Sequence, residues 1–354
     1  MTVPGLAVCD LHLPRNEETD RVKSSEKPPL SPEPLDPQLT TIQPGGGFVM
    51  RMELAWGRVR RWYLRTFCRS YVARMQQLRK GEENPCPHEV LDPRDLKFYQ
   101  NQGGFYWEPH DDPFAWRDRL PFARAGLAEL LFFSTVTFVP AAVLAWQIVA
   151  RQIDGTWATL AWLVVLALLV VGGLIVWFFR DPNRRVPDEE GVVVSPADGK
   201  VVQVEHVEDN EFMDGPAVQI GIFLSIFNVH MNRAPMRSRV IQLIYRPGKF
   251  LNALLPRSAQ ENEQLEVRLQ ELAPSHRRMI VRQIAGAIAR RIVCWSKPGD
   301  ELATGERFGM IKLGSRTELV IPDEPGLEIV VKPGDRVKAG STIMARYRDG
   351  ASSS

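Results

Sequence analysis

The sequence predicts an α+β protein in which a helical part with membrane-spanning segments precedes a β-rich domain. Two long uncharged runs lie in the middle of the chain, and short alternating strands separated by Gly and Pro turns begin at Val192. We divide the chain into a disordered tail (1–47), a basic, partly amphipathic helical region (48–124), a transmembrane helical hairpin (125–180) and a β-rich domain (181–354).

The overall composition excludes few classes of protein. A formal net charge of +2 predicts no general affinity for polyanions, so we expect no nucleic-acid partner. The four cysteines are scattered without a Cys-x-x-Cys pair, which predicts reduced thiols that face a cytoplasm, with no disulfide framework. Cys86, His88 and His110 match the spacing of no closed metal site, and we expect no metal.

The first part of the chain carries few structural signals. Residues 1–47 mix prolines and charges without periodic apolar spacing, which predicts disorder, and no apolar run indicates a secretory signal. Residues 58–80 alternate arginines with apolar side chains that share one helical face. Such a helix either lies on anionic lipid or packs on its own protein with a solvated arginine face. The face comprises Leu64, Phe67, Tyr71, Met75 and Leu78.

Two uncharged runs, 130–150 and 156–179, are each long enough as helices to cross a bilayer core of about 30 Å. Only residues 151–155 join them, which predicts a tight antiparallel hairpin. Three arginines precede the first run and three follow the second, so both ends should lie in the cytoplasm. The alternative is a pair of buried core helices in a soluble protein.

A nine-residue pattern repeats within the β-rich domain. Residues 297–305, Lys-Pro-Gly-Asp-Glu-Leu-Ala-Thr-Gly, are echoed by Lys-Pro-Gly-Asp-Arg-Val-Lys-Ala-Gly at 332–340. The echo predicts two equivalent hammerhead turns of a barrel-sandwich fold, similar to biotinyl and lipoyl carrier domains. The charged, proline-free run 259–272 predicts a helix.

Gly314-Ser315 is the dipeptide whose side chain could react with its own backbone. A serine hydroxyl can attack the preceding glycine carbonyl where a turn is strained and a base is near, and elimination across the resulting ester leaves a ketone. Alone, Gly-Ser is typical of ordinary turns. In the same way, a lone His230 on a strand or an Asp198 before glycine would usually be structural.

Three segments together change this interpretation. They are Ser-Pro-Ala-Asp-Gly-Lys-Val at 195–201, Phe-Leu-Ser-Ile-Phe-Asn-Val-His-Met-Asn-Arg-Ala-Pro at 223–235, and Leu-Gly-Ser-Arg at 313–316. Their sequences and order resemble the pyruvoyl-dependent phosphatidylserine decarboxylase proenzymes, in particular the branch with Gly-Ser-Arg. The resemblance covers roughly residues 175–345, and nothing comparable covers the first 120 residues.

The resemblance implies a membrane-bound lyase of phospholipid biosynthesis that converts phosphatidylserine to phosphatidylethanolamine and CO₂. Its zymogen would cut itself between Gly314 and Ser315, and Ser315 would become a covalent pyruvoyl group, so no added cofactor is needed. The catalytic residues implied are Ser315, His230 as the base and Asp198 as the partner that orients it. The two fragments would stay associated, a homo-oligomer is possible, and the catalytic domain would face the cytoplasm from the cell membrane.

One position departs from the family pattern. A second histidine lies three residues beyond the first in one branch, whereas this chain has Arg233 there, which leaves open whether His230 serves both self-cleavage and turnover. The Arg233 guanidinium offers a fork for a phosphate or carboxylate of the substrate, or for an ion pair within the barrel. Two other functions remain open: an archaetidylserine-like decarboxylase, and a non-enzymatic, membrane-anchored lipoyl-like binding module.

Overall fold

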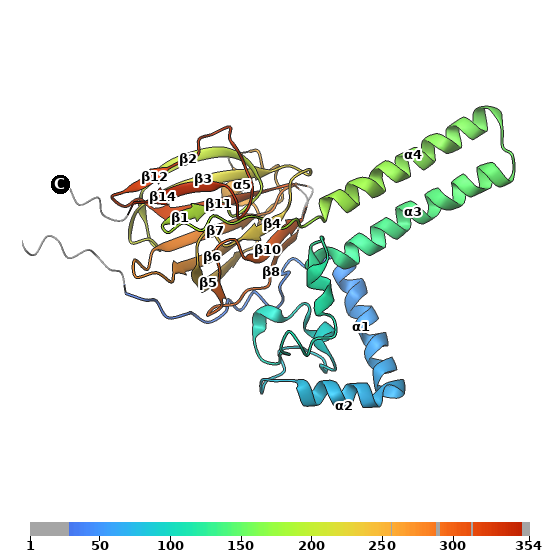
Figure 1. The fold of residues 1–354 in the computed structure, drawn as a ribbon, viewed down its shortest axis with the longest axis horizontal. Helices are drawn as coiled ribbons and strands as arrows, with labels where there is room; N and C mark the ends of the chain where they lie inside the picture. Colours follow the sequence, from blue (N-terminus) through green and yellow to red (C-terminus); the bar gives the residue numbers. More distant parts are fainter. Residues whose placement is uncertain (1–27, 256, 288–290, 313, 349–354) are drawn as a thin grey trace, which may run out of the picture.

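The computed structural model describes residues 28–255, 257–287, 291–312 and 314–348. A β-rich domain, a helical region and two long helices that project from their junction make up the described chain (Figure 1). The mixed helix and strand content agrees with the predicted α+β class.

The helical region contains two α-helices and four short 3₁₀ turns. A break at Cys68 divides the predicted continuous helix 58–80, which is therefore wrong in this respect. Met75 is buried in a core cluster with the partly buried Tyr71 and Leu78, whereas Phe67 is 64% exposed. Most of the predicted apolar face thus packs on the protein itself. The elements are α1 (Phe48–Phe67), α2 (Arg69–Leu78), η1 (Pro93–Leu96), η2 (Gln100–Gln102), η3 (Ala115–Arg119) and η4 (Arg124–Gly126).

A different face of α1 is apolar and exposed. Its inner face buries Met50, Gly57 and Leu64 at helical spacing. The opposite face carries large apolar side chains that are exposed along the whole helix. The ring of Phe48 lies 6.4 Å, between centroids, from that of Phe132 in the projecting helix α3 (Leu127–Ala150). The exposed face therefore begins beside the projecting pair of helices. Its members are Phe48, Met52, Trp56, Val59, Trp62, Tyr63 and Phe67.

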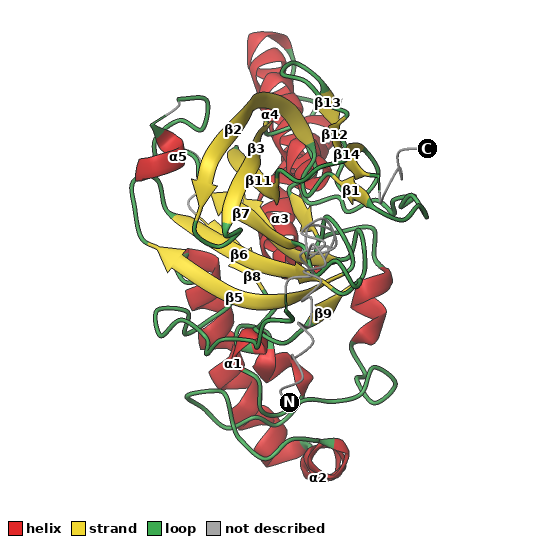
Figure 2. Cartoon of the chain, turned by 90° about the vertical axis from the view of Figure 1, so that its left-hand side faces the viewer, coloured by secondary structure: helices red, strands yellow, loops and turns green. Residues whose placement is uncertain are grey.

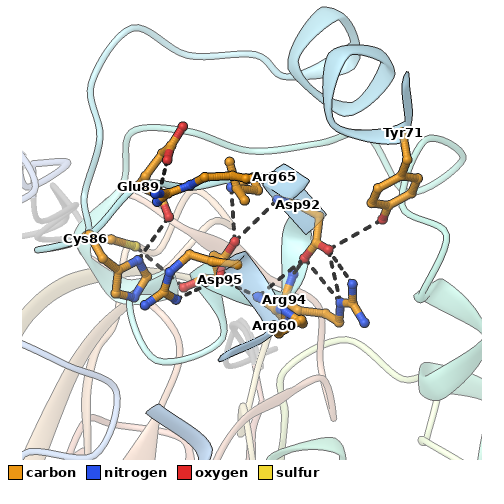
Figure 3. Close-up of polar contacts among 11 residues, drawn as sticks. Arg60, Arg65, Tyr71, Cys86, Glu89, Asp92, Arg94 and Asp95 are labelled. Atoms are coloured by element: carbon orange, nitrogen blue, oxygen red, sulfur yellow. Dashed lines mark hydrogen bonds and ion pairs between the residues drawn. The ribbon is translucent and has the colours of Figure 1, made fainter. Parts of the chain in front are cut away.

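Buried carboxylates hold α1 against the η1 turn (Figure 3). Asp95 accepts from Arg60 and Arg61, and Asp92 accepts from Arg94 while capping η1. Both carboxylates have no side-chain exposure, so water does not screen these pairs. Several arginines of this basic region thus have structural partners. Arg65, by contrast, pairs with Glu89 at the surface.

The projecting helices are α3 (Leu127–Ala150) and α4 (Gly155–Phe178), which pack on each other through Ala141, Ile148 and Val165. Both are long and apolar enough to cross a membrane. Only 17% and 11% of their most apolar windows are buried, which does not agree with the alternative of two buried core helices in a soluble protein. Length and composition alone indicate membrane association.

The β-rich domain contains a curled eight-stranded antiparallel sheet and two three-stranded sheets (Figure 2). The large sheet has the order β13-β2-β3-β11-β7-β6-β5-β9, and the small ones are β1-β14-β12 and β4-β10-β8. The strands are β1 (Val192–Val194), β2 (Gly199–Asn210), β3 (Gly215–Leu224), β4 (Met231–Arg233), β5 (Ser238–Arg246), β6 (Gln264–Glu271), β7 (Arg278–Ile284), β8 (Arg291–Cys294), β9 (Glu301–Leu302), β10 (Arg307–Lys312), β11 (Ser315–Pro322), β12 (Leu327–Ile329), β13 (Arg336–Val337) and β14 (Ile343–Tyr347).

The predicted helix 259–272 is wrong. One turn of helix, α5 (Ser258–Glu261), is followed by strand β6 in the middle of the large sheet. Leu265, Val267 and Leu269 recur with period two and are fully buried, which is the spacing of a strand. The charged residues between them also find partners inside the sheet, because Glu266 accepts from Arg282 of β7.

The repeated Lys-Pro-Gly-Asp pattern forms two matching turns. The Lys297 N–H donates to Asp300 Oδ2 and the Lys332 N–H donates to Asp335 Oδ2, both at 2.9 Å. The glycine of each turn has a positive φ, 94° and 107°. The strands that follow, β9 and β13, lie at opposite ends of the large sheet. The two turns are therefore equivalent, as predicted, while the barrel-sandwich assignment stays a prediction.

Residues 28–47 do not form the disordered tail that their composition predicts. Leu39 and Ile42 are buried, and the backbone of Ile42 accepts from Cys294 of β8 and donates to Phe98. The segment lacks periodicity because it crosses the surface as an extended chain, where isolated apolar side chains suffice for anchoring. Residues 1–27 of the predicted tail lie outside the described residues.

Replacing Asp95 by Asn should destabilise the helical region strongly, because two buried guanidinium groups would lose their anion. We expect a loss of about 3 kcal/mol or more in the free energy of unfolding. Glu89→Gln, which breaks the exposed pair with Arg65, should cost less than about 1 kcal/mol. Denaturant unfolding of both variants in detergent, followed by near-ultraviolet circular dichroism, tests this contrast. Equal stability of the two variants would contradict it.

Candidate active site

The turn that carries the Gly-Ser dipeptide joins two different sheets. Strand β10 of a three-stranded sheet ends at Lys312, and β11, in the interior of the large sheet, begins at Ser315. Gly314 lies between them with a φ of +61°, a left-handed conformation that glycine adopts without strain. Leu313 lies outside the described residues.

Gly286 packs directly against the carbonyl group of Gly314. A Cβ atom at position 286 would lie 1.9 Å from the Gly314 oxygen, far inside contact distance. Only glycine therefore leaves room for this carbonyl. The sequence alone assigns no role to this glycine, because its contact with Gly314 joins segments that are distant in the chain.

His230 immediately precedes β4, and its ring lies beside the Gly314 backbone. The Gly314 N–H donates to Nε2 at 3.2 Å, and Nδ1 lies 2.9 Å from the carbonyl oxygen of Asn228. These partners define a neutral tautomer in which Nδ1 carries the proton and Nε2 is the acceptor. A neutral imidazole therefore lies beside the turn, and its role as the base stays a prediction.

The surroundings of His230 keep its ring neutral. The side chain is 1% exposed, and the ring of Phe178, in the last turn of α4, lies 4.6 Å away between centroids. Burial lowers the pKa of His230 to about 4, with a smaller contribution from the charge of Arg180. An imidazole with this pKa is uncharged at neutral pH and can accept a proton.

Ser315 is fully buried, and its hydroxyl has no hydrogen-bond partner among the described residues. A buried hydroxyl without a partner costs free energy, so it marks a position held for a reason other than stability. The structure thus brings His230, Gly314 and Ser315 together in one turn.

Asp198 does not contact His230. Its Oδ1 accepts from the Ala339 N–H at 2.8 Å, and its Oδ2 accepts from Arg184 at 2.7 Å. The carbonyl of Asn228 occupies the orienting position that the sequence assigned to Asp198. Sequence reasoning missed this partner because a backbone carbonyl leaves no signature in the side-chain pattern.

Arg233 forms the ion pair that the sequence left as one of two possibilities. Its buried guanidinium donates to Asp181 at 3.1 Å and to the backbone oxygens of Gly305 and Pro182. These bonds tie the segment after α4 to the β-rich domain. Most of the guanidinium is therefore already engaged within the chain.

A second buried contact joins the helices to the strand that leads into the turn. Lys312 of β10 pairs with Glu129 in the first turn of α3, and its Nζ also lies 3.1 Å from Gln43 Oε1. Burial lowers the pKa of Lys312, while the charge of Glu129 opposes this effect. The beginning of α3 and the end of α4 thus both contact the region around Gly314.

The chain is similar to known proteins over most of its length. The model of the phosphatidylserine decarboxylase family matches residues 171–345. A phosphatidylserine decarboxylase proenzyme of Rhodopirellula baltica is 50% identical over 255 residues, which cover 72% of this chain and all of that protein. Proteins with the same name are 37% identical in Desulfotalea psychrophila, over 64% of this chain and 97% of theirs, and 46% identical in Symbiobacterium thermophilum, over 54% and 84%.

These similarities first define the class of the chain: a carboxy-lyase of phospholipid biosynthesis that is made as a proenzyme. The chain belongs to the phosphatidylserine decarboxylase family, whose members convert phosphatidylserine to phosphatidylethanolamine. The alternative of a non-enzymatic binding module is thereby set aside.

Replacing Phe178 by Ala should raise the pKa of His230 from about 4 toward its ordinary value of 6.5, because water would reach the ring. Nitrogen-15 spectra of histidine-labelled protein, titrated between pH 3.5 and 8, measure this change, and His230→Gln identifies the resonance. An unchanged titration midpoint would show that Phe178 does not control the protonation of His230.

Proposed function

We propose that the chain cleaves itself between Gly314 and Ser315 and, with the pyruvoyl group so formed, decarboxylates phosphatidylserine to phosphatidylethanolamine. The observation that carries the proposal is the contact of the neutral His230 Nε2 with the Gly314 N–H, next to a buried serine hydroxyl without a partner. Membership of the decarboxylase family supports it independently.

Self-cleavage needs only groups of the chain and one water. The Ser315 Oγ attacks the Gly314 carbonyl carbon, His230 Nε2 takes the hydroxyl proton, and the Ser315 nitrogen leaves as an amine, which gives an ester. Loss of the Ser315 Cα proton then breaks the Cβ–Oγ bond and leaves a carboxylate on Gly314. Water then hydrolyses the dehydroalanine left at position 315, so that a keto oxygen takes the place of its nitrogen and ammonia departs. Gly286 supports the first step because it leaves the scissile carbonyl in place.

The fragment 315–354 should stay bound after scission. Its first strand, β11, pairs with β3 along eight residues and with β7 on its other side, and its side chains are buried throughout. Further along, β13 pairs with β2, and β14 lies between β1 and β12. Cutting the turn removes none of these ladders, so the new terminus remains in the interior of the domain.

The position of Ser315 fits the predicted prosthetic group. A buried position without a competing hydrogen bond can hold a small carbonyl group, which supplies an electron sink for the carbanion left by departing CO₂. Around it, Phe178 excludes water, and His230 holds or moves a proton at Nε2. Asp198 is proposed as a positioning residue that fixes the 339 turn, and Arg233 as a group that holds Asp181 and not as a direct substrate ligand.

The helices support a site at a membrane surface. We place α3 and α4 across the bilayer as a hairpin, with both ends and the catalytic domain in the cytoplasm by the positive-inside rule. The exposed face of α1, rich in Trp, Tyr and Phe, then suits the headgroup layer. Because Phe178 contacts His230, the site lies directly beneath that layer.

The two matching Lys-Pro-Gly-Asp turns support a barrel-sandwich-like fold for the β-rich domain.

Gly286→Ala should impair scission severely, because the new methyl group must displace the Gly314 carbonyl. We expect a rate at least about tenfold lower, equivalent to about 1.4 kcal/mol in the barrier. Gly173→Ala is the matched control, since an added methyl there meets no atom within 4 Å. Denaturing electrophoresis after timed synthesis measures the cut, together with CO₂ release from phosphatidylserine vesicles. Normal cutting by Gly286→Ala, or cutting and turnover by Ser315→Ala, would refute the mechanism.

Scission should depend on pH through His230. The ring must be neutral to accept a proton, so the rate should be flat between pH 6 and 8 and fall as the pH drops through about 4. Timed electrophoresis of freshly refolded proenzyme gives this profile, with circular dichroism at each pH to show that the fold persists. A midpoint near 6.5 would mean that His230 is not the base or is not buried during the reaction.

A further inference from the structure

A large cavity lies between the helical region, the start of α3 and the edge of the β-rich domain. Its volume is about 1140 Å³, above the usual range of about 300–1,000 Å³ for small-molecule sites. Neither Ser315 nor His230 lines it, although Met231 and Arg233, the first and last residues of β4, do. Most of its wall comes from residues before 171, outside the segment that matches the family model.

We call the part of the cavity wall around Arg94, Arg117 and Arg124 its basic end. Eight Arg and Lys side chains line the cavity, against five Asp and Glu. Arg94 pairs with Asp92 and Arg124 with Asp118, whereas Arg117 has no carboxylate partner among the described residues and stacks on the rings of Phe114 and Trp116. Burial, together with the charges of Arg94 and Arg124, lowers the pKa of Arg117. An anion at this point would relieve the repulsion.

The other end of the cavity is apolar and continues onto the candidate membrane helices. Leu131, Ser134 and Phe138 of α3 line it, together with Val176 of α4. Leu131 is also 70% exposed on the outer surface of α3. The cavity therefore connects a cluster of guanidinium groups with a surface that suits hydrocarbon.

We propose that this cavity holds one anionic phospholipid, with its phosphate at Arg117 and an acyl chain along Leu131 and Phe138. A soluble phosphate compound would use only the basic end, and an uncharged lipid would leave Arg117 without an anion. The assignment requires the membrane placement of α3 and α4 but does not require the decarboxylation that we propose above. The cavity would keep a lipid adjacent to the strand that follows His230.

Native mass spectrometry of the purified full-length protein, with phosphatidylglycerol added in detergent, tests the assignment. We expect one tightly bound lipid, and a loss of at least about tenfold in affinity for Arg117→Gln, because a charge-assisted hydrogen bond is removed. Arg119→Gln is the matched control: this arginine belongs to the same 3₁₀ turn, is exposed and does not line the cavity. Equal binding by the two variants would overturn the proposal.

A second pair of variants tests the apolar end. Ser134→Trp should obstruct the apolar end of the cavity and weaken binding at least about tenfold, whereas Thr135→Trp, exposed on α3 and outside the lining, should bind normally. Phosphatidylcholine should bind at least about tenfold more weakly than phosphatidylglycerol, because its headgroup is zwitterionic. Glycerol phosphate binding as tightly as phosphatidylglycerol, and unaffected by Ser134→Trp, would identify a soluble-anion site and overturn the lipid assignment. None of these measurements needs turnover, so they stand apart from any failure of the decarboxylase proposal.

Discussion

The contact between His230 and the backbone of Gly314 is the interaction on which the rest of this structure depends. It places a neutral imidazole at the turn that carries Gly314-Ser315, and the neutral state exists because Phe178 and the surrounding strands exclude water. An exposed histidine would be partly charged at neutral pH and less able to accept a proton. The same burial leaves the Ser315 hydroxyl without a hydrogen-bond partner among the described residues.

This arrangement places the two long apolar helices directly beside the candidate active site, without an intervening domain. The last turn of α4 covers His230, and the first turn of α3 supplies Glu129 to Lys312, two residues before Gly314. A lipid that meets the protein at the foot of these helices is therefore already near the reactive turn. The antiparallel ladders that join β11 to β3 and β7 would hold the new terminus after the proposed cleavage.

The sequence predicted much of this plan, but through two different kinds of argument. Hydropathy alone indicated α3 and α4, and the repeated Lys-Pro-Gly-Asp pattern alone indicated two equivalent turns. His230 and Ser315 stood out only through family resemblance. Charge composition misled at 259–272, where the alternation of Leu265 and its neighbours carried the true signal. Asn228, Phe178 and Gly286 could not be predicted, because each acts through a contact between segments distant in sequence or through its backbone.

The mass of the mature chain tests the central claim most directly. Intact mass spectrometry of purified protein should show a small fragment of residues 315–354, separated from the 40.1 kDa continuous chain. That fragment should be lighter, by the mass of one ammonia, than the peptide of the same residues with an intact amino-terminal serine, because a pyruvoyl group takes the place of that serine. A single continuous chain in active protein, or a fragment with a free amino-terminal serine, would contradict the account.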